Sequence, residues 1–206
     1  MGTRNLTIVK IDGKYPLANY GQWDGYPSGQ GATILSFLRD EFKPSFIYEV
    51  LPKLKELDEN ESKKVLEKIG SKDGWMTDDQ FQQWKRYFPF CDRNFGGGIL
   101  HLINTYNDEV IVLNNQLDFA ADSLFCEWAY VIDLDTNTFE VYKGFNKIPL
   151  TEQDRFYFLQ GKIPPNEAKD DEKYYPVKLI ASFKLNELPT EEEFLNHPAF
   201  KQEEEE

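Results

Sequence analysis

The hydrophobic pattern at the start of the chain is typical of a β-hairpin. Residues 6–11 (LTIVKI) are rich in strand-forming residues, and the pair Asp12-Gly13 that follows is a strong turn signal. Residues 15–20 can return as a second strand. The sequence therefore predicts that the protein opens with two paired strands.

The next segment, residues 19–31 (NYGQWDGYPSGQG), is too polar and too rich in glycine for a core element, and too aromatic for an ordinary linker. Behind it, residues 32–42 place their apolar side chains on one helical face. Ser28 is a suitable cap near the start of this helix. The segment is therefore predicted to join the second strand to the first helix.

The middle of the chain has helical periodicity. A helical pattern over residues 44–57 is interrupted at Pro52, which lacks a backbone N–H. Residues 58–69 carry a second pattern, in which charged residues surround a narrow apolar face. Thr77 with Gln80 has the spacing of a capping box ahead of the segment DQFQQWKRYF. Residues 99–103 then predict a further short helix.

The pattern changes to strands in the later part of the chain. The predicted strands are EVIVLNN (109–115), FCEWAYVIDLD (125–135), TFEVYKGF (138–145) and YPVKLIASFKL (175–185). One or two helical turns are expected in residues 151–159, and a short last helix is expected behind Thr190. This order predicts an α+β fold: an N-terminal β-hairpin, a helical middle, and C-terminal antiparallel strands that join one sheet.

Length and charge indicate how the chain is divided. The 206 residues fit one domain, for which we expect residues 1–198, followed by an acidic tail at 199–206. Residues 186–206 hold eight Glu and one Lys, so they carry about half of the net charge of −13. The simplest interpretation of Glu203 to Glu206 is a solvated end that aids solubility. The alternative is an acidic protein inhibitor, whose carboxylates mimic nucleic-acid phosphates and occupy a basic partner.

Composition also narrows the classes of partner. No basic patch is present, so direct binding of nucleic acid is not expected. The sequence contains neither an apolar run near the roughly 20 residues of a membrane helix nor a secretory signal, which predicts a cytoplasmic protein that does not contact membranes. Cys91 and Cys126 fit a reducing compartment, and without a CxxC pair or a histidine cluster we expect no metal and no cofactor.

The glycine-rich junction contains the residues on which a binding prediction depends. Flat aromatic faces stack on bases or sugars, and polar side chains between them supply directional hydrogen bonds. The predicted ligand-binding residues are Tyr20, Gln22, Trp23, Asp24, Tyr26 and Gln30, with Arg4 from the adjoining strand and Trp128 or Tyr130 from the later sheet. The alternative is structural: Trp23 fills the core and Asp24 caps the turn.

Gly25, Gly29 and Gly31 allow two interpretations. Backbone amides at a helix start attract anions, but the GxGxxG and Gly-Lys-Ser/Thr patterns are both missing. The glycines are explained equally by a sharp turn between a strand and a helix, and their position at this junction favours the turn.

Catalytic motifs are incomplete. Asp133 to Asn137 (DLDTN) fails both the phosphatase and the calcium-loop pattern and predicts a hairpin turn. A nucleophile pair of Cys126 with His101 has no local support. An amidohydrolase of the N-terminal-nucleophile class, built from four α+β layers, would need a cleavage that frees Thr3, because removal of Met1 exposes only Gly2.

Two stretches of the sequence resemble one family. GTRNLT (2–7) with YGQWDGYPSGQG (20–31), and DFAADSLFCEWAYVIDLDTNTFEVYKGF (118–145), are similar to a family of uncharacterised proteins from bacteria, phages and fungi. These stretches cover about a quarter of the chain. The resemblance implies a compact intracellular domain without an assigned activity. A phage setting would favour counter-defence, in which the protein sequesters a nucleotide signal or blocks a host protein.

The sequence thus supports a binding protein for a small polar or nucleotide-like ligand, or for a protein partner, as the first hypothesis. The amidohydrolase and the acidic inhibitor are the alternatives. The oligomeric state is left open by the sequence.

Overall fold

The structure, a computed structural model, describes residues 2–43, 45–71, 75–107, 109–162 and 173–201. Its strands are β1 (Asn5–Ile11), β2 (Lys14–Gly21), β3 (Leu54–Glu56), β4 (Ile111–Leu113), β5 (Trp128–Asp133), β6 (Thr138–Lys143) and β7 (Lys178–Lys184). The helices are α1 (Ala32–Ser36), α2 (Glu59–Lys68), α3 (Asp78–Tyr87), α4 (Ile99–Thr105) and α5 (Glu191–Leu195). Short helical turns are η1 (Pro27–Gly31), η2 (Phe37–Glu41), η3 (Phe46–Val50), η4 (Leu51–Lys53), η5 (Gly96–Gly98), η6 (Leu117–Ala121), η7 (Tyr157–Leu159) and η9 (Pro198–Phe200).

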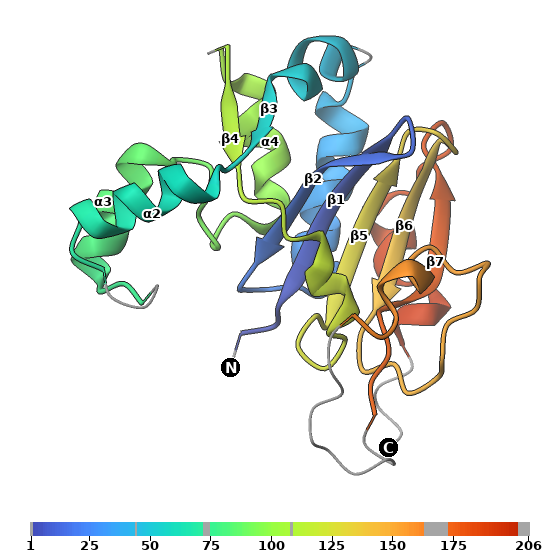
Figure 1. Cartoon of the computed structure of the whole chain (residues 1–206). Helices are drawn as coiled ribbons and strands as arrows, with labels where there is room; N and C mark the ends of the chain where they lie inside the picture. Colours follow the sequence, from blue (N-terminus) through green and yellow to red (C-terminus); the bar gives the residue numbers. More distant parts are fainter. Residues whose placement is uncertain (1, 44, 72–74, 108, 163–172, 202–206) are drawn as a thin grey trace.

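A five-stranded sheet in the order β2-β1-β5-β6-β7 forms the centre of the molecule (Figure 1). The predicted α+β fold is confirmed, including the opening hairpin β1–β2, the helical middle and the later strands β5 to β7. The sheet is mixed, however, because β5 lies beside β1 and runs parallel to it. Strand β4 does not join this sheet and pairs in parallel with the short strand β3.

The sheet is buried on both faces, which explains the continuous apolar sequence of β5. Trp128, Tyr130 and Ile132 point to the face that α1, α4 and α5 cover, whereas Ala129 and Val131 point to the opposite face. Successive side chains of a strand point to opposite faces, so a strand between two layers needs apolar residues at nearly every position. Irregular segments, including η6 and η7, cover the second face.

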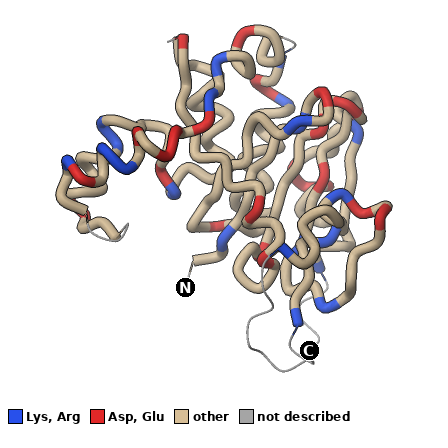
Figure 2. The backbone as a smooth tube through the Cα atoms, viewed as in Figure 1, with Lys and Arg blue, Asp and Glu red and all other residues tan. Residues whose placement is uncertain are grey.

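Helices α2 and α3 form a separate unit, here called the arm, which projects from the body beside β2 (Figure 1). Its own small core contains Val65, Ile69, Trp84 and Phe88. The predicted capping box of Thr77 and Gln80 is present at the start of α3. Charges of both signs follow each other along the arm and along the body (Figure 2).

Other local predictions were partly right. The helix predicted at 32–42 is present, but the helical stretch already begins at Pro27, preceded by Tyr26, so Ser28 is not its cap. The predicted break at Pro52 is present, and residues 54–56 form β3 where the pattern suggested helix. The pairing of Asp133 with Thr138 confirms that DLDTN is a hairpin turn.

The single large sheet, with helices on one face and irregular segments on the other, differs from the four-layer arrangement of the N-terminal-nucleophile hydrolases. At the other end of the chain, Phe200 packs on Trp128 and Phe194, and the boundary at 198 stays a prediction. Glu203 to Glu206 lie outside the described residues. Within the described part, no helix has the length and apolar character that a membrane crossing requires.

Candidate functional site

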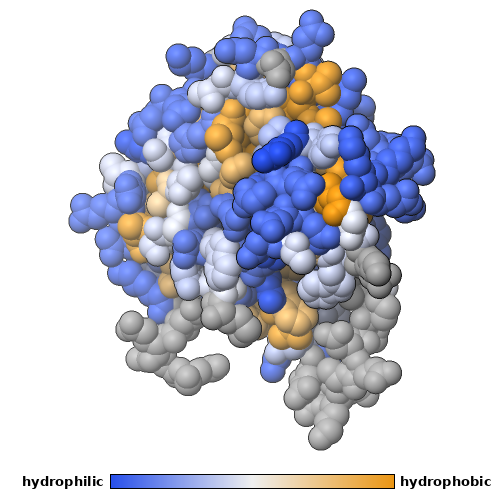
Figure 3. All heavy atoms as spheres, turned by 90° about the vertical axis from the view of Figure 1, so that its left-hand side faces the viewer, coloured by the Kyte–Doolittle hydropathy of each residue, from blue (hydrophilic) through white to orange (hydrophobic). Residues whose placement is uncertain are grey.

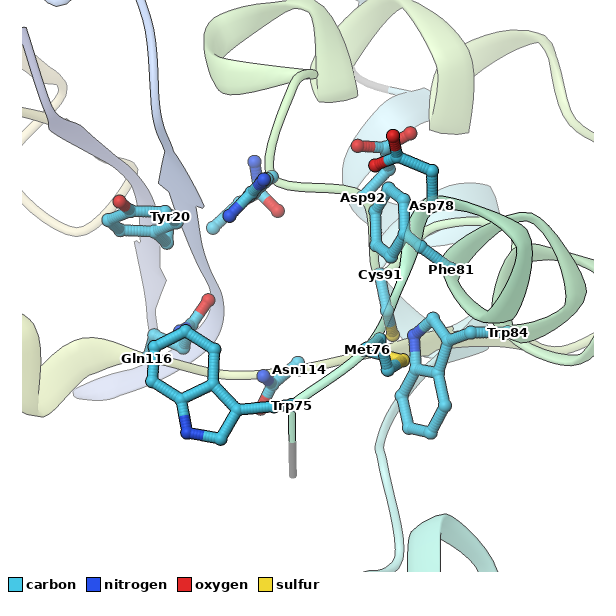
Figure 4. A pocket seen from close by; sticks show the side chains of 12 residues that line it. Tyr20, Trp75, Met76, Asp78, Phe81, Trp84, Cys91, Asp92, Asn114 and Gln116 are labelled. Atoms are coloured by element: carbon cyan, nitrogen blue, oxygen red, sulfur yellow. The ribbon is translucent and has the colours of Figure 1, made fainter. Parts of the chain in front are cut away.

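A cavity of about 580 Å³ lies between the arm and the sheet edge formed by β2. We call it the β2 groove. In Figure 4, Tyr20 and Gln116 lie on one side of it, and Phe81 and Trp84 from α3 lie on the other. The residues that line it are Asn19, Tyr20, Trp75, Met76, Asp78, Phe81, Trp84, Cys91, Asp92, Arg93, Asn114 and Gln116.

The open edge of β2 forms one wall of the groove. The carbonyl of Ala18 points away from β1, because it accepts a hydrogen bond of 2.8 Å from the Gln116 N–H. Four residues on, the N–H of Gln22 likewise points outward and donates to the Arg93 carbonyl at 2.8 Å. Backbone groups of an antiparallel strand alternate in direction, so the N–H and C=O of Tyr20 also point outward. We find no hydrogen bond for these two groups within the described residues, and they lie between two points where the edge is covered.

Aromatic rings form the opposite wall. Phe81 and Trp84 come from α3, whereas Trp75 before this helix is 85% exposed and its indole extends toward Gln116 (Figure 4). Two cations lie over the Phe81 ring: Lys85 Nζ is 5.1 Å from its centroid, and the Arg93 guanidinium carbon is 5.9 Å away. These cations hold the Phe81 ring, and the part of the ring that they leave open lines the groove beside Trp84.

Charge in the groove is distributed unevenly. Asp92 is buried, and its carboxylate is compensated by Lys85 at 3.3 Å and by the backbone N–H of Asn94. Asp78 is exposed in the first turn of α3. Burial raises the pKa of the Cys91 thiol to about 11, so this thiol is protonated at neutral pH and a weak nucleophile. The groove thus offers hydrogen-bonding and stacking groups without an activated cysteine.

The structure brings part of the predicted binding set to this groove. Tyr20 lines it, and its hydroxyl donates to Gln22 Oε1 at 2.6 Å. Trp23 is half exposed, and its indole N–H donates to Asn94 Oδ1 at 3.0 Å, two residues from the lining residue Asp92. Trp23 does not fill the core, so this structural alternative is wrong.

Gln30 joins two loops behind the groove. Its amide nitrogen donates to the Trp23 carbonyl at 3.2 Å, and its amide oxygen accepts from the Gly97 N–H at 2.7 Å. Asp24 adopts a positive φ of 54°, and its carbonyl accepts from the Gln30 N–H. Gln30 and Asp24 therefore shape the loop, whereas Tyr26 is half exposed and does not line the groove.

The glycines of this segment have structural causes. A Cβ on Gly29 would collide with the Asp24 carbonyl oxygen, and a Cβ on Gly31 would lie 3.0 Å from the Tyr130 ring. Chain crossings this close exclude larger residues. These contacts support the interpretation of the glycines as a turn.

Arg4 and Trp128 are placed differently from each other. The Arg4 guanidinium lies over the Phe125 ring at 4.9 Å, on the sheet face that also carries the Tyr20 ring. Trp128 is only 6% exposed and belongs to the core under the helices, so the prediction that it lines a ligand site does not fit its position. Tyr130 is fully buried there, and its hydroxyl donates to the Gly25 carbonyl at 2.8 Å. Strand alternation places both residues on the helix-covered face.

The groove also contains functional candidates that the sequence did not indicate. Trp75, Phe81 and Arg93 come from segments more than fifty positions after Tyr20. The exposed aromatic residues around the capping box of α3 were the one available signal, since aromatic side chains on an otherwise charged helix need a partner.

The remaining catalytic candidates lie apart from each other. The His101 ring contacts Glu41 Oε1 at 2.7 Å on the helix-covered side, whereas Cys126 is buried on the opposite face of the sheet. Thr3 is buried, and its carbonyl accepts from the Gly25 N–H at 3.0 Å. No group of three or more His, Cys, Asp and Glu side chains suited to a metal occurs within the ranges that the structure describes.

A second polar cluster lies at the other end of the sheet and joins the segment that contains Arg155 to β5 and β6. Arg155 bonds Asp133 at 2.5 Å and Glu140 at 2.8 Å, and Lys10 adds a further pair to Asp133 at 3.2 Å. Burial disfavours ionised Asp133, but hydrogen bonds from Arg155, the Thr136 backbone and Lys10 outweigh it and lower its pKa to about 2. The cluster anchors the segment around η7 to the sheet.

Comparisons of the chain with protein-family models, with curated proteins and with solved structures give no match. The resemblance to the bacterial, phage and fungal family therefore stays a prediction, and the site has to be interpreted from its own geometry.

Proposed function

We propose that this chain is a binding protein that holds a small polar ligand with a flat ring, of the nucleotide-like kind, in the β2 groove. The observation that carries the proposal is the groove itself. It combines an aromatic wall from the arm with the open peptide group of Tyr20 on the facing strand.

The size and chemistry of the groove support a small ligand. Its volume of about 580 Å³ falls within the roughly 300–1,000 Å³ of ligand pockets. Phe81 and Trp75 can stack on a planar ring, while the amides of Asn114 and Gln116 can read the hydrogen-bonding edge of that ring. Such a division between flat apolar walls and few polar groups is usual in ligand sites.

The covered edge of β2 argues for a small ligand over an added strand. A peptide that extends a sheet needs several consecutive open backbone groups. Here Gln116 already covers the edge at Ala18, and Arg93 covers it at Gln22. Only a group about one residue wide can therefore reach the N–H and C=O of Tyr20.

The surface around the groove supports the same choice. Figure 3 views the molecule from the side of the arm, and the apolar residues there form separate small patches among hydrophilic ones. Interfaces that stabilise a protein complex usually need a larger continuous apolar area. The alternative, in which the chain blocks a partner protein through this face, is therefore the weaker proposal.

The test is a binding screen with matched variants. Nucleosides, linear and cyclic nucleotides and ADP-ribose-like compounds would be titrated while intrinsic tryptophan fluorescence and the melting temperature are measured. A ligand present at about 100 times its Kd should stabilise the fold by about 2.7 kcal/mol. Trp75→Ala and Phe81→Ala should each weaken binding about tenfold or more, because stacking contributes about 1–3 kcal/mol per ring.

Tyr48→Ala is the matched control, since Tyr48 is 77% exposed and does not line the groove. It should leave binding unchanged. If no compound shifts the melting temperature, or if Tyr48→Ala weakens binding as much as Phe81→Ala does, the groove is not the ligand site.

A further inference from the structure

Two arginines, Arg4 and Arg93, lie at the Tyr20 end of the groove. In a chain of net charge −13, Arg155, Lys10 and Lys85 all form ion pairs with acidic side chains. Arg4 and Arg93 form none with any carboxylate of the described residues. Arg39 and Arg86 also form no ion pair among the described residues, so what distinguishes Arg4 and Arg93 is that both lie beside one groove and one tyrosine.

Each of these guanidinium groups is supported by an aromatic ring. Arg93 lies over Phe81 and Arg4 lies over Phe125, at 5.9 and 4.9 Å from the ring centroids. An arginine stacked in this way keeps its in-plane N–H groups available, and these groups match the geometry of a phosphate or carboxylate. One N–H of Arg4 donates to the Tyr20 hydroxyl, and the stacking leaves the remaining in-plane donors of both arginines available.

Backbone pairing brings both arginines to the same tyrosine. Arg4 lies two residues before Leu6, which pairs with Tyr20 across the hairpin, and the Arg93 carbonyl binds the N–H of Gln22. Burial raises the pKa of the Tyr20 hydroxyl, and the charges of Arg4 and Arg93 both oppose this rise. The positive potential of both side chains thus reaches the phenol.

Gln22 completes the donor set. Its amide oxygen accepts from the Tyr20 hydroxyl at 2.6 Å, which leaves its amide nitrogen as a further donor beside the two arginines. Two carboxylates lie near Arg4. Glu127 Oε1 accepts a hydrogen bond from the Arg4 backbone N–H. Burial raises the pKa of Asp122, and the charge of Arg4 opposes this rise.

We infer that Arg4, Arg93 and Gln22 form an anion subsite beside Tyr20, which takes a phosphate or carboxylate group of the ligand. This inference rests on the proposed function, because it places the anionic group of the same ligand whose ring lies in the groove. The ring would lie toward Phe81 and Trp75, and the anionic group toward Arg4. Asp78 lies beside Phe81 (Figure 4), so it favours hydrogen-bond donors at the ring end of the ligand.

The first experiment uses inorganic phosphate alone, so that it does not depend on the ring-binding part of the groove. Arginine Nε–Hε resonances would be followed by NMR during a phosphate titration and assigned with Arg4→Gln and Arg93→Gln. We expect the resonances of Arg4 and Arg93 to shift and saturate, while that of Arg86, exposed on α3 of the same arm, stays unchanged. No shift, or equal shifts at all three, overturns the subsite; equal shifts would mean an adventitious ion only.

The second experiment compares adenosine with AMP by calorimetry at low and high salt. AMP should bind about tenfold more tightly at low salt, because its phosphate adds hydrogen bonds to charged donors. The advantage should shrink as salt screens the charges. Arg4→Gln should remove it without changing adenosine affinity, Arg4→Lys and Arg93→Lys should retain part of it, and Arg86→Gln should have no effect.

The two proposals fail in different ways. Adenosine that binds as tightly as AMP overturns the anion subsite and leaves the groove intact. Phosphate that shifts Arg4 and Arg93 while neither adenosine nor AMP binds supports the subsite and removes the nucleotide-like ligand from the proposed function.

Discussion

Tyr20 contributes to the groove and to the packing of the sheet through both its side chain and its backbone. Its ring packs edge-on against Phe119 at 5.0 Å, and its hydroxyl binds Gln22, while its peptide groups face the groove. The sequence singled out Tyr20 and Gln22 because polar and aromatic residues alternated in a glycine-rich segment. Trp128 was selected by the same aromatic criterion, yet its position in β5 places it in the core.

The glycines of the junction provide a test at the level of single residues. Gly29→Ala should lower the free energy of unfolding by about 1–3 kcal/mol, because the new methyl group would collide with the Asp24 carbonyl oxygen. Gly98→Ala is the matched control, since no atom lies within 4 Å of a Cβ at that position. Urea denaturation measures both. Equal stability of Gly29→Ala and the wild type would show that the loop can open and that its glycine has another role.

The Asp133 carboxylate predicts a pH dependence of stability. Its pKa of about 2 in the folded chain lies below the ordinary value of 3.8, so its contribution is full above pH 3.8 and is lost as the pH falls toward 2. Unfolding free energies of the wild type should therefore decrease in this window, and those of Asp133→Asn should decrease less. Parallel pH profiles of the two proteins would contradict the assignment.

Removal of Arg155, the cation that pairs with Asp133, should lower the free energy of unfolding more than protonation of Asp133 does. Arg155→Met leaves Asp133 and Glu140 without their shared cation, and breaking a buried ion pair from one side costs about 3–5 kcal/mol. Lys162→Met is the control, because its pair with Asp118 at 3.7 Å is exposed and should contribute less than about 1 kcal/mol. Urea denaturation at neutral pH compares them; a similar loss in both variants would mean that the Arg155 cluster is not an anchor.

Among the elements, helices that carry their own start signals were predicted best. The capping boxes of α3 and α5 were evident from Thr77 with Gln80 and from Thr190 with Glu193, because these bonds join residues only three positions apart. The direction of β5 relative to β1 and the separate pairing of β4 with β3 were not predictable. Pairing across more than fifty residues leaves no local trace in the sequence.

The cap of α3 should matter for the arm more than for the body. Thr77→Ala removes a cap worth about 1 kcal/mol and should speed amide exchange across α3 while that of β5 stays unchanged. Thr77→Ser, which keeps the hydroxyl, should exchange like the wild type. Faster exchange in β5 as well would show that the arm and the sheet unfold together.

At the level of the whole molecule, the groove lies between two packed units. The arm has its own core of Val65, Ile69, Trp84 and Phe88, and the sheet has two larger clusters on its faces. A cavity bounded by a small unit and a large one can change its width when the small unit shifts. Ligand affinity should then depend on how firmly the arm is held.

Ligand binding should therefore protect the arm. With saturating AMP, amide exchange should slow in α3 and around Arg93, which contribute one wall of the groove, and stay unchanged in β6 and β7 at the far side of the sheet. Hydrogen exchange followed by mass spectrometry measures this. Uniform slowing over all these strands would indicate global stabilisation without a specific role for the arm.

By itself, the sequence determined the local structure of this protein: the opening hairpin, the capped helices, the DLDTN turn, and the aromatic junction that contains Tyr20 and Gln22. Each of these depends on residues within a few positions of each other, whose conformational preferences act directly. Only the tertiary structure decided that β1 and β5 run in parallel, that β2 is an edge strand, and that Phe81 lies across the groove from Tyr20 with Arg93 between them (Figure 4). The physical reason is that these contacts join distant segments, so packing of the whole chain selects them and no short pattern encodes them.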